Sequence, residues 1–244
     1  MVSKTKLQRK FSKAVQNLNR KGDMKITNFN LVYENLMPNQ QKKLKDVSGP
    51  EFKNLLDNGS IISLALTYTE NEILVINEKK EKWKIYARAY VKINHQLHLL
   101  SEEIADHIQG IPILPTIDGL VGKINHVQEF FPLTISHRLI GEYAGMGWRG
   151  KNNLIIHPQF SCAFRFTSVL TPYAFNPDQK LERTCGDCTA CYSVCSFLKN
   201  QEKLIDYREN CRKYILKLDL GADVCGKCIK ACYSLSDFKN AFQI

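Results

Sequence analysis

Cysteines are the residues of this sequence whose number and spacing most directly predict chemistry. Eight of the nine lie between Cys185 and Cys232, and only Cys162 lies elsewhere. Their order is C-x2-C-x2-C-x3-C, then a single cysteine, then C-x2-C-x3-C. A [4Fe-4S] cluster is held by four thiolates, and a C-x2-C-x2-C turn can supply three of them from one short segment. The sequence therefore predicts an iron-sulfur protein.

The spacing also predicts how the eight cysteines divide between two [4Fe-4S] clusters. In two-cluster ferredoxins, the fourth cysteine of such a run ligates the other cluster. We therefore expect a first cysteine set of Cys185, Cys188, Cys191 and Cys232, and a second cysteine set of Cys195, Cys211, Cys225 and Cys228. Two structural zinc sites are the alternative. Such sites usually combine separate C-x2-C pairs, and the run that begins at Cys185 is too compact for that arrangement.

A glycine-rich stretch is the second candidate site. Gly145, Gly147 and Gly150 fit the pattern G-x-G-x-x-G, which in a dinucleotide site lets the backbone approach a pyrophosphate. That use requires a strand before the motif and a helix after it. Here a helical pattern precedes the motif and a strand pattern follows it, which argues against a nicotinamide site. We expect instead a tight glycine loop with Trp148, Arg149 and Lys151 available to a ligand.

Apolar periodicity and turn residues predict the elements that position these residues. Strands are expected at 60–68, 111–116, 153–156 and 163–170, and helices at 51–57, 81–109 and 135–143. Because helices and strands do not alternate regularly, an α+β layered domain is the expected fold class. The long helix carries His95 and His98, for which a polar surface stripe is favoured over a metal site because no third ligand is near.

The positive charge of the chain is concentrated near its N-terminus. The formal net charge is +10, and residues 1–25 hold eight Lys or Arg against Asp23 alone. Apolar residues recur there at steps of three and four: Leu7, Phe11, Ala14, Val15 and Leu18. This pattern predicts an amphipathic helix. Its basic face is expected to be solvated, or else to contact an acidic protein or a tRNA.

Composition and segment lengths exclude several classes of protein. The 244 residues, 44% of them hydrophobic, are enough to bury a core, so extensive disorder is excluded. The longest apolar runs are strand-sized and far below the roughly 18 residues that a membrane-spanning helix needs. The N-terminus lacks the pattern of a secretory signal, and clustered cysteines that bind metal are typical of a reducing compartment. We therefore expect a cytoplasmic protein without a membrane partner.

Taken together, the motifs resemble the epoxyqueuosine reductase family and, more distantly, the core of the reductive dehalogenases. The similar segments are AGMGWRGKN at 144–152, LIIHPQF at 154–160, the strand at 165–170 with Thr171-Pro172 after it, and CGDCTAC at 185–191. The resemblance is specific from about His137 to Cys232. It implies a nitroreductase-like α+β domain that holds a corrinoid beside two [4Fe-4S] clusters in a ferredoxin-like domain.

The resemblance also implies a division of the chain and a function. The expected parts are a basic N-terminal segment at 1–25, a nitroreductase-like α+β domain at 26–180 and a double-cluster ferredoxin-like domain at 181–244. Electrons from a donor such as ferredoxin or flavodoxin would pass through the clusters to cobalamin, or to another cofactor or substrate, in the N-terminal domain. The alternative is a ferredoxin-like protein that delivers electrons to a partner without substrate chemistry of its own.

Three positions need separate interpretation within this resemblance. The proton-donating aspartate of the family falls at or near Phe131, and a phenyl ring cannot deliver a proton. Acidic or imidazole side chains that could substitute are Glu129, Asp118, Glu142 and His137. Arg165 is expected to bind a carboxamide or phosphate of the cofactor, with a strand-surface ion pair as the alternative. Cys162 is expected to be a small buried hydrophobe, with an added ligand near a cofactor as the alternative.

Overall fold

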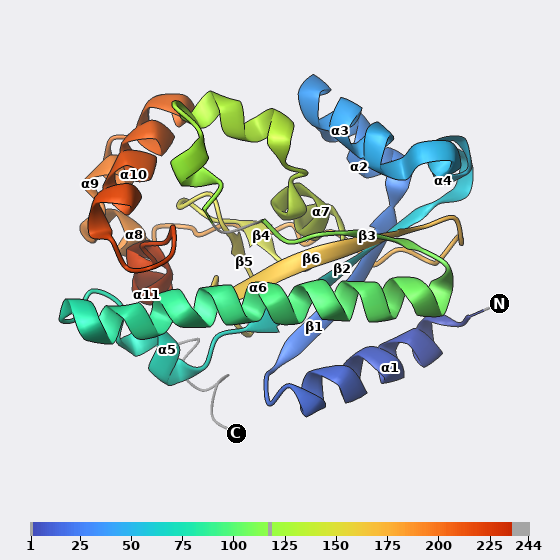
Figure 1. Cartoon of the computed structure of the whole chain (residues 1–244), viewed down its shortest axis with the longest axis horizontal. Helices are drawn as coiled ribbons and strands as arrows, with labels where there is room; N and C mark the ends of the chain where they lie inside the picture. The colour runs from blue at the N-terminus through green and yellow to red at the C-terminus, as the bar shows by residue number, and fades with distance from the viewer. Residues whose placement is uncertain (1, 117–118, 236–244) are drawn as a thin grey trace.

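A four-stranded antiparallel sheet forms the centre of the molecule (Figure 1). The computed structural model describes residues 2–116 and 119–235. The strands follow the order β1-β2-β6-β3 across the sheet. Their bounds are β1 Gly22–Asn28, β2 Ser60–Thr67, β6 Phe164–Thr171 and β3 Ile111–Ile113. The mixture of helices and strands confirms a mixed α/β fold, and the proline-containing strand β3 lies at a sheet edge, where a missing backbone N–H is tolerated.

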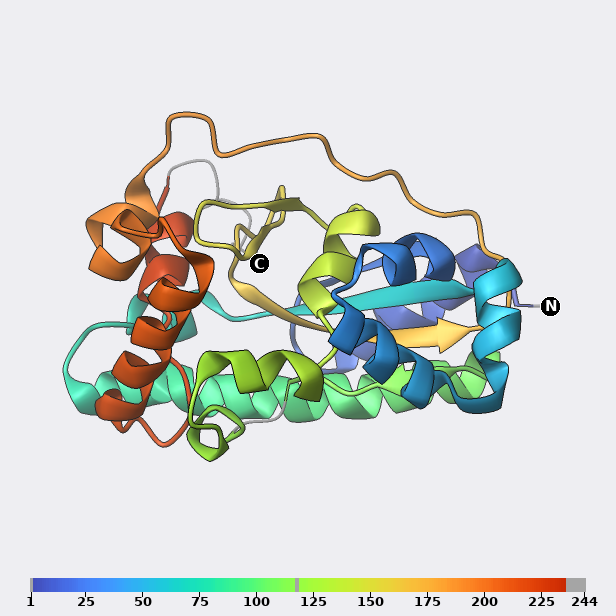
Figure 2. The same cartoon turned by 90° about the horizontal axis from the view of Figure 1, so that it is seen from above.

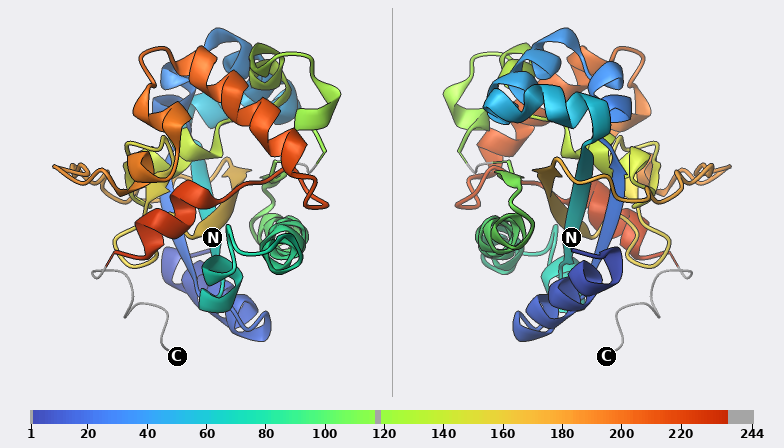
Figure 3. Two further views of the ribbon diagram at one scale, coloured as in Figure 1. Left: turned by 90° about the vertical axis from the view of Figure 1, so that its left-hand side faces the viewer. Right: turned by 90° about the vertical axis from the view of Figure 1, so that its right-hand side faces the viewer.

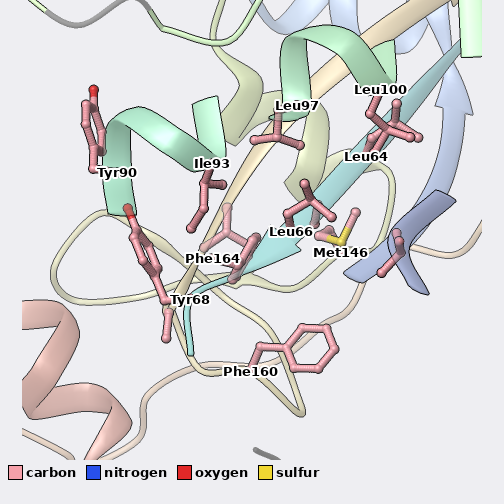
Figure 4. Packing of buried hydrophobic residues seen from close by; sticks show 14 of the residues in the cluster. Leu64, Leu66, Tyr68, Tyr90, Ile93, Leu97, Leu100, Met146, Phe160 and Phe164 are labelled. Atoms are coloured by element: carbon pink, nitrogen blue, oxygen red, sulfur yellow. The ribbon is translucent and has the colours of Figure 1, made fainter. Parts of the chain in front are cut away.

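Strand β2 is buried along its whole length because both faces of the sheet are covered. Ile62, Leu64 and Leu66 belong to one apolar cluster with residues of the long helix α6 (Lys80–Ile108). Ile61 points to the opposite face and packs in a second cluster with residues of α2, α4 and α7. Successive side chains of a strand point to opposite faces, so one short apolar run serves two cores. Figure 4 shows part of the first cluster.

Helix α6 runs along one side of the sheet and buries a stripe of residues at steps of three and four (Figure 3). Gln109, with a φ of 50°, ends the helix in a left-handed turn. Gly110 follows, where an added Cβ would lie 2.5 Å from the Leu170 carbonyl oxygen of β6. His98 lies on the outer face of the helix and pairs with Glu102 at 3.2 Å. The predicted polar stripe therefore fits the structure.

The N-terminal helix α1 (Lys4–Asn17) is amphipathic, as predicted, and buries Leu7, Phe11 and Val15 against the sheet. Strand β1 follows it directly and was not predicted. Part of the basic charge is paired within the chain. Lys4 contacts Asp178 at 2.9 Å, Lys10 contacts Glu103 at 2.8 Å and Arg20 contacts Glu72 at 2.9 Å.

The remaining elements are short. Those before the cysteine-rich region are α2 Phe29–Asn35, α3 Pro38–Ser48, α4 Phe52–Asn58, α5 Glu70–Leu74 and α7 His137–Tyr143, with 3₁₀ helices at Gly49–Glu51, Val121–Lys123 and Val127–Leu133. A two-stranded hairpin is formed by β4 (Trp148–Arg149) and β5 (Ile155–Ile156). The strands predicted at 153–156 and 163–170 are thus present in shorter or shifted form, but they lie in different sheets.

A long extended stretch, residues 172–189, connects the sheet to the cysteine-rich region (Figure 2). It is attached midway to β1, because Asp178 and Ile26 exchange two hydrogen bonds of 2.8 Å. The helices that follow are α8 Ala190–Ser193, α9 Ser196–Lys199, α10 Leu204–Leu218 and α11 Lys227–Tyr233. Leu220, Val224 and Tyr233 belong to the same apolar cluster as β2 and α6. The cysteine-rich region therefore packs directly on the body of the molecule.

Among residues 2–116 and 119–235, we find no helix that combines the length and the apolar character needed to cross a membrane.

Candidate functional site

The four side chains of the first cysteine set line one recess. Its walls are Cys185, Cys188, Cys191, Cys232, Ala190, Lys151, Asn152 and Ile156, around a cavity of about 20 Å³. This volume is far below the range of about 300–1,000 Å³ that is usual for pockets that hold organic ligands. The recess is therefore too small for an organic substrate, and its polar lining is dominated by thiols.

The second cysteine set gathers around helix α10. Burial is the main cause that raises the pKa of Cys211 to about 12, and the neighbouring thiols of Cys225 and Cys195 add to it. Burial, followed by Cys225, Cys211 and Cys195, likewise raises the pKa of Cys228. These mutual effects show that the four thiols of the set lie near one another. The indole N–H of Trp83 donates to the carbonyl oxygen of Cys225 at 2.8 Å and fixes this set against α6.

In the part of the chain that the structure describes, no three His, Cys, Asp or Glu side chains are arranged to hold a single metal ion. A zinc ion would draw four sulfurs to about 2.3 Å from one atom. Whether the sets hold clusters stays a prediction.

The electrostatics of the first set combine burial with hydrogen bonding. Burial, then Cys185 and Cys232, raise the pKa of Cys191 to about 11. The pKa of Cys232 is lowered instead, because a hydrogen bond from the thiol of Cys162 outweighs burial. The same hydrogen bond is the largest cause that raises the pKa of Cys162. Cys162 is buried, as predicted, and it interacts with Cys232, a predicted cluster ligand.

The first set lies beside the glycine loop, which spacing alone could not establish. The Lys151 ammonium donates to the carbonyl oxygen of Gly186 at 2.7 Å, and Gly186 follows Cys185. The side-chain amide of Gln201 donates to the carbonyl oxygen of Lys151 at 3.0 Å and ties the loop to the start of α10. Lys151 thus joins the glycine loop to the first cysteine set.

The three glycines are explained by packing of the chain on itself. Gly145 has a φ of +75°, and an added Cβ would lie 2.1 Å from the Gln179 carbonyl oxygen. Added Cβ atoms at Gly147 and Gly150 would lie 2.3 Å and 2.7 Å from atoms of Ile156. The hairpin of β4 and β5 occupies the place where a dinucleotide site has a helix. Cofactor binding by these glycines stays a prediction.

Two other predicted cofactor ligands are positioned differently. The indole N–H of Trp148 is buried and has no hydrogen-bond partner among the described residues, so a polar ligand group could satisfy it. Arg165 donates from Nε to the Asn94 side-chain oxygen at 3.1 Å, and its guanidinium lies 4.4 Å from the centre of the Tyr90 ring. Both contacts come from α6. Arg165, on strand β6, therefore contacts the buried side chains of Asn94 and Tyr90 on α6.

The residues considered as proton donors are held in other roles. Phe131 lies in the 3₁₀ helix at 127–133, with its ring against Phe130. Glu129 accepts the backbone N–H of Asn125 at 3.1 Å. Glu142 forms an ion pair with Arg149 at 2.7 Å. Asp118 lies outside the described residues.

His137 is a neutral histidine of the core. Its Nε2–H donates to the Leu114 carbonyl oxygen at 2.9 Å, because a carbonyl can only accept, and its Nδ1 accepts from the Ser168 hydroxyl at 2.9 Å. Burial is the main cause that lowers the pKa of His137 to about 4. At neutral pH the ring has no proton to give without breaking one of these bonds.

A buried ion pair on α10 was missed by the sequence interpretation. Arg212 contacts Glu209 at 2.7 Å and donates to backbone carbonyls of Ile124 and Asn125 at 3.0 Å and 2.8 Å. Glu209 also accepts the Val127 N–H at 2.8 Å. These contacts, with Arg212 first, hold the pKa of Glu209 at about 2. The sequence did contain a signal for this pair, because Glu209 and Arg212 are three residues apart on a helix.

Sequence and structure comparisons identify related proteins. The chain is 29% identical over 143 residues to the epoxyqueuosine reductase of Bacillus anthracis, covering 56% of this chain and 34% of the relative. It is 29% identical over 109 residues to that of Escherichia coli K12, covering 44% and 25%. The solved epoxyqueuosine reductase of Streptococcus thermophilus aligns with a TM-score of 0.45 and 17% identity over 78% of this chain and 52% of that chain.

The matched part is about a third or less of the length of these curated relatives. No family model matches the chain. The sequence matches to curated relatives that share one name nevertheless support the same assignment as the motifs. The matched part of the chain is thus similar to epoxyqueuosine reductases.

Proposed function

We propose that this protein is an iron-sulfur reductase related to epoxyqueuosine reductase and acting in the queuosine pathway. The observation that carries the proposal is the recess lined by Cys185, Cys188, Cys191 and Cys232, which borders the glycine loop at Lys151 and Asn152. Those four cysteines are the ones that spacing assigns to a single [4Fe-4S] cluster. An electron that reaches this recess is next to the α+β body of the molecule, where a substrate or second cofactor would bind.

The two cysteine sets are the proposed ligands of two [4Fe-4S] clusters, which supply one-electron transfer when bound. The chain holds the ligands in place from both sides. Lys151 fixes the loop that carries Cys185 and Cys188, and Trp83 fixes the backbone at Cys225. The raised pKa values of Cys191 and Cys211 mean that thiols must lose protons when metal binds.

A corrinoid is the proposed cofactor of the α+β body, where it would supply a strongly reducing cobalt. The residues that fit it are Trp148, with its buried indole N–H lacking a partner, together with Lys151 and Arg165. Gly145, Gly147 and Gly150 contribute by allowing the hairpin of β4 and β5 to pack tightly beside the recess. We propose the domain limits of 26–180 for this nitroreductase-like part and 181–244 for the ferredoxin-like part.

The protonation step is proposed to differ from that of the family. Phe131 cannot donate a proton, and Glu129, Glu142 and His137 are all engaged in other contacts. A proton would therefore have to come from water or from the substrate. A carrier that only delivers electrons to a partner is the less favoured alternative, because the matched relatives are named as reductases.

The proposed partners are an electron donor such as ferredoxin or flavodoxin, and a tRNA or an acidic protein at α1. Lys6, Arg9 and Lys13 are exposed on this helix and could contact phosphates. A cytoplasmic location is proposed from the nine free cysteines.

Metal content after anaerobic preparation tests the proposal. We expect about eight iron atoms and as many sulfides per chain, as two clusters require, and a change in the absorbance of added cobalamin. In Trp148→Phe, cobalamin binding should weaken about tenfold, since the variant loses one hydrogen-bond donor. Trp83→Phe is the matched control, because its indole already donates to Cys225. Full-length protein that takes up no iron on reconstitution would refute the proposed function, and iron without cobalamin binding would refute the corrinoid alone.

A further inference from the structure

Three arginines from different parts of the chain lie around the loop that joins β4 and β5. Arg138 is on α7, Arg149 on β4 and Arg208 on α10. Asn153 in this loop connects two of these elements: its carbonyl oxygen accepts from Arg138, and its side-chain amide donates to the Tyr207 hydroxyl at 2.6 Å. The guanidinium of Arg208 lies 5.8 Å from the centre of the Tyr207 ring. In Figures 1 and 2 the hairpin accordingly lies between α7 and α10.

The three arginines carry more positive charge than the carboxylate beside them can neutralise. Arg149 donates from Nε and Nη2 to one carboxylate oxygen of Glu142, at 3.0 Å and 2.7 Å. Glu142 lies one helical turn after Arg138 on α7, so this pair also places Arg149 near Arg138. Among the described residues, this is the only ion pair that any of the three arginines forms. The arginines and Glu142 together therefore have a net charge of +2.

The guanidinium of Arg208 has a donor without a polar partner. Its Nε is buried and makes no hydrogen bond to any residue that the structure describes. A buried donor that stays unpaired is unfavourable, and a ligand oxygen would remove that cost. Burial, then Arg208 and Arg149, lower the pKa of Arg138 to about 9. The like charges therefore repel one another, and a bound anion would relieve the repulsion.

We propose that Arg138, Arg149 and Arg208 form a binding site for a phosphate monoester, such as the phosphate group of a mononucleotide. A guanidinium presents its N–H donors in a planar fork that matches the oxygens of a phosphate. It has five N–H groups, so Arg138 and Arg149 keep donors beyond those that bind Asn153 and Glu142. A phosphate monoester carries a charge of about −2 at neutral pH, which matches the net charge of the site. A phosphate in a nucleic-acid backbone carries a single negative charge.

The proposed phosphate site borders the recess without being part of it. Asn153 follows Lys151 and Asn152, which line the recess, so one short loop serves both places. The three arginines belong to neither cysteine set. The inference therefore goes beyond the proposed function and does not require that clusters are bound.

Isothermal titration calorimetry of the full chain with three probes tests the proposal. Adenosine 5′-monophosphate and inorganic phosphate should bind, whereas adenosine, which lacks the phosphate, should not. In Arg208→Met the Kd for adenosine monophosphate should rise about tenfold, because one charged donor group is lost. Arg208→Lys keeps the charge but not the planar fork, and its Kd should lie between the two. Urea unfolding of each variant checks that it remains folded.

A matched control removes one positive charge outside the site. Arg88 is an exposed arginine on α6, and Arg88→Met should leave the Kd unchanged. An equal rise of the Kd in Arg88→Met and Arg208→Met would mean that the net charge of the chain attracts the ligand, and it would refute the site.

The remaining outcomes separate the ligand sources and the two proposals. An RNA oligonucleotide without terminal phosphates that displaces adenosine monophosphate at equal concentration would refute the monoester in favour of backbone phosphates. A full chain that takes up iron but binds neither adenosine monophosphate nor inorganic phosphate would refute this inference alone. A chain that binds both phosphate probes but takes up no iron would refute the proposed function alone.

Discussion

The two cysteine sets occupy different environments. In the first set, Cys185 and Cys188 lie on the loop before α8, next to a recess and to the glycine loop. The second set is enclosed by α9, α10 and α11, and Cys225 is fixed to α6 through Trp83. The first set therefore lies where the proposed electron exchange with the α+β body would take place, while the second set links the C-terminal helices to the body.

The largest expected effect separates the two sets by removing one ligand from each. Cys211→Ala should lose about four iron atoms and also destabilise the fold, because α10 and the Leu220–Val224 region pack in the main core. Cys185→Ala should lose a similar amount of iron with a smaller change in stability, because its loop is partly exposed. Iron analysis and anaerobic thermal unfolding check both. Equal losses of stability would remove the proposed difference between the sets.

The second prediction concerns the ion pair beside Cys211. Arg212→Met leaves Glu209 as a buried carboxylate without its main partner, so the free energy of unfolding should fall by about 3 kcal/mol. Urea unfolding measures this change. Because α10 carries Cys211, iron should be lost from the second set before the first. The exposed Lys213→Met is the control and should change stability by less than about 0.5 kcal/mol. A similar loss in both variants would contradict a special role for Arg212.

Lowering the pH should remove two contributions to stability in sequence, first that of His137 and then that of Glu209. The folded pKa of His137, about 4, lies below its ordinary value of 6.5, so its stabilising contribution is present above pH 6.5 and is lost as pH falls toward 4. At pH 5 the loss in the free energy of unfolding, relative to pH above 6.5, is about 2 kcal/mol. Glu209, with a folded pKa of about 2, loses its contribution only between about pH 4.5 and 2.

Unfolding of wild-type and His137→Gln proteins between pH 8 and pH 5 measures the first of these steps. The variant should show a flatter dependence of stability on pH, because the glutamine does not ionise. An equal slope in the two proteins would show that His137 is not the group that titrates.

The smallest expected effect compares one hydrogen bond at each set. Lys151→Met removes the bond to the Gly186 carbonyl and should loosen the first set, whereas Trp83→Phe removes the bond to the Cys225 carbonyl and should loosen the second. Each should cost about 1 kcal/mol. The rate of iron release to a chelator, followed separately for each cluster signal, checks the pairing. If both variants released iron from the same set, the two hydrogen bonds would not act on different sets.

The central elements could be predicted because their patterns are strong. The buried run at 60–68 becomes β2, and the apolar stripe at 81–109 becomes α6, since packing on both faces requires those periods. Spacing also predicts the membership of the cysteine sets, and the four cysteines of the first set line one recess.

Other features could not be predicted because they depend on contacts between distant segments. Strand β1 has a polar sequence, and pairing with β2 decides its conformation. The glycine loop matched a cofactor motif, yet the space at Gly147 is taken by Ile156 of the same hairpin. The position of Cys162 beside Cys232, which lies 70 residues away along the chain, could not be derived from the cysteine spacing. Local patterns do not report such long-range contacts.

The attachment of Asp178 to Ile26 has a consequence for the tether that carries the first cysteines. Together with the Phe175 N–H, which donates to Ser60 Oγ at 3.0 Å, and Lys180, which pairs with Glu142 at 3.8 Å, it divides the stretch from Thr171 to Cys185 into shorter segments. A shorter loop has less closure entropy to lose and a higher effective concentration of its end at the target. The exchange of hydrogen bonds at the edge of the sheet therefore holds Cys185 and Cys188 near the recess before any ligand is bound.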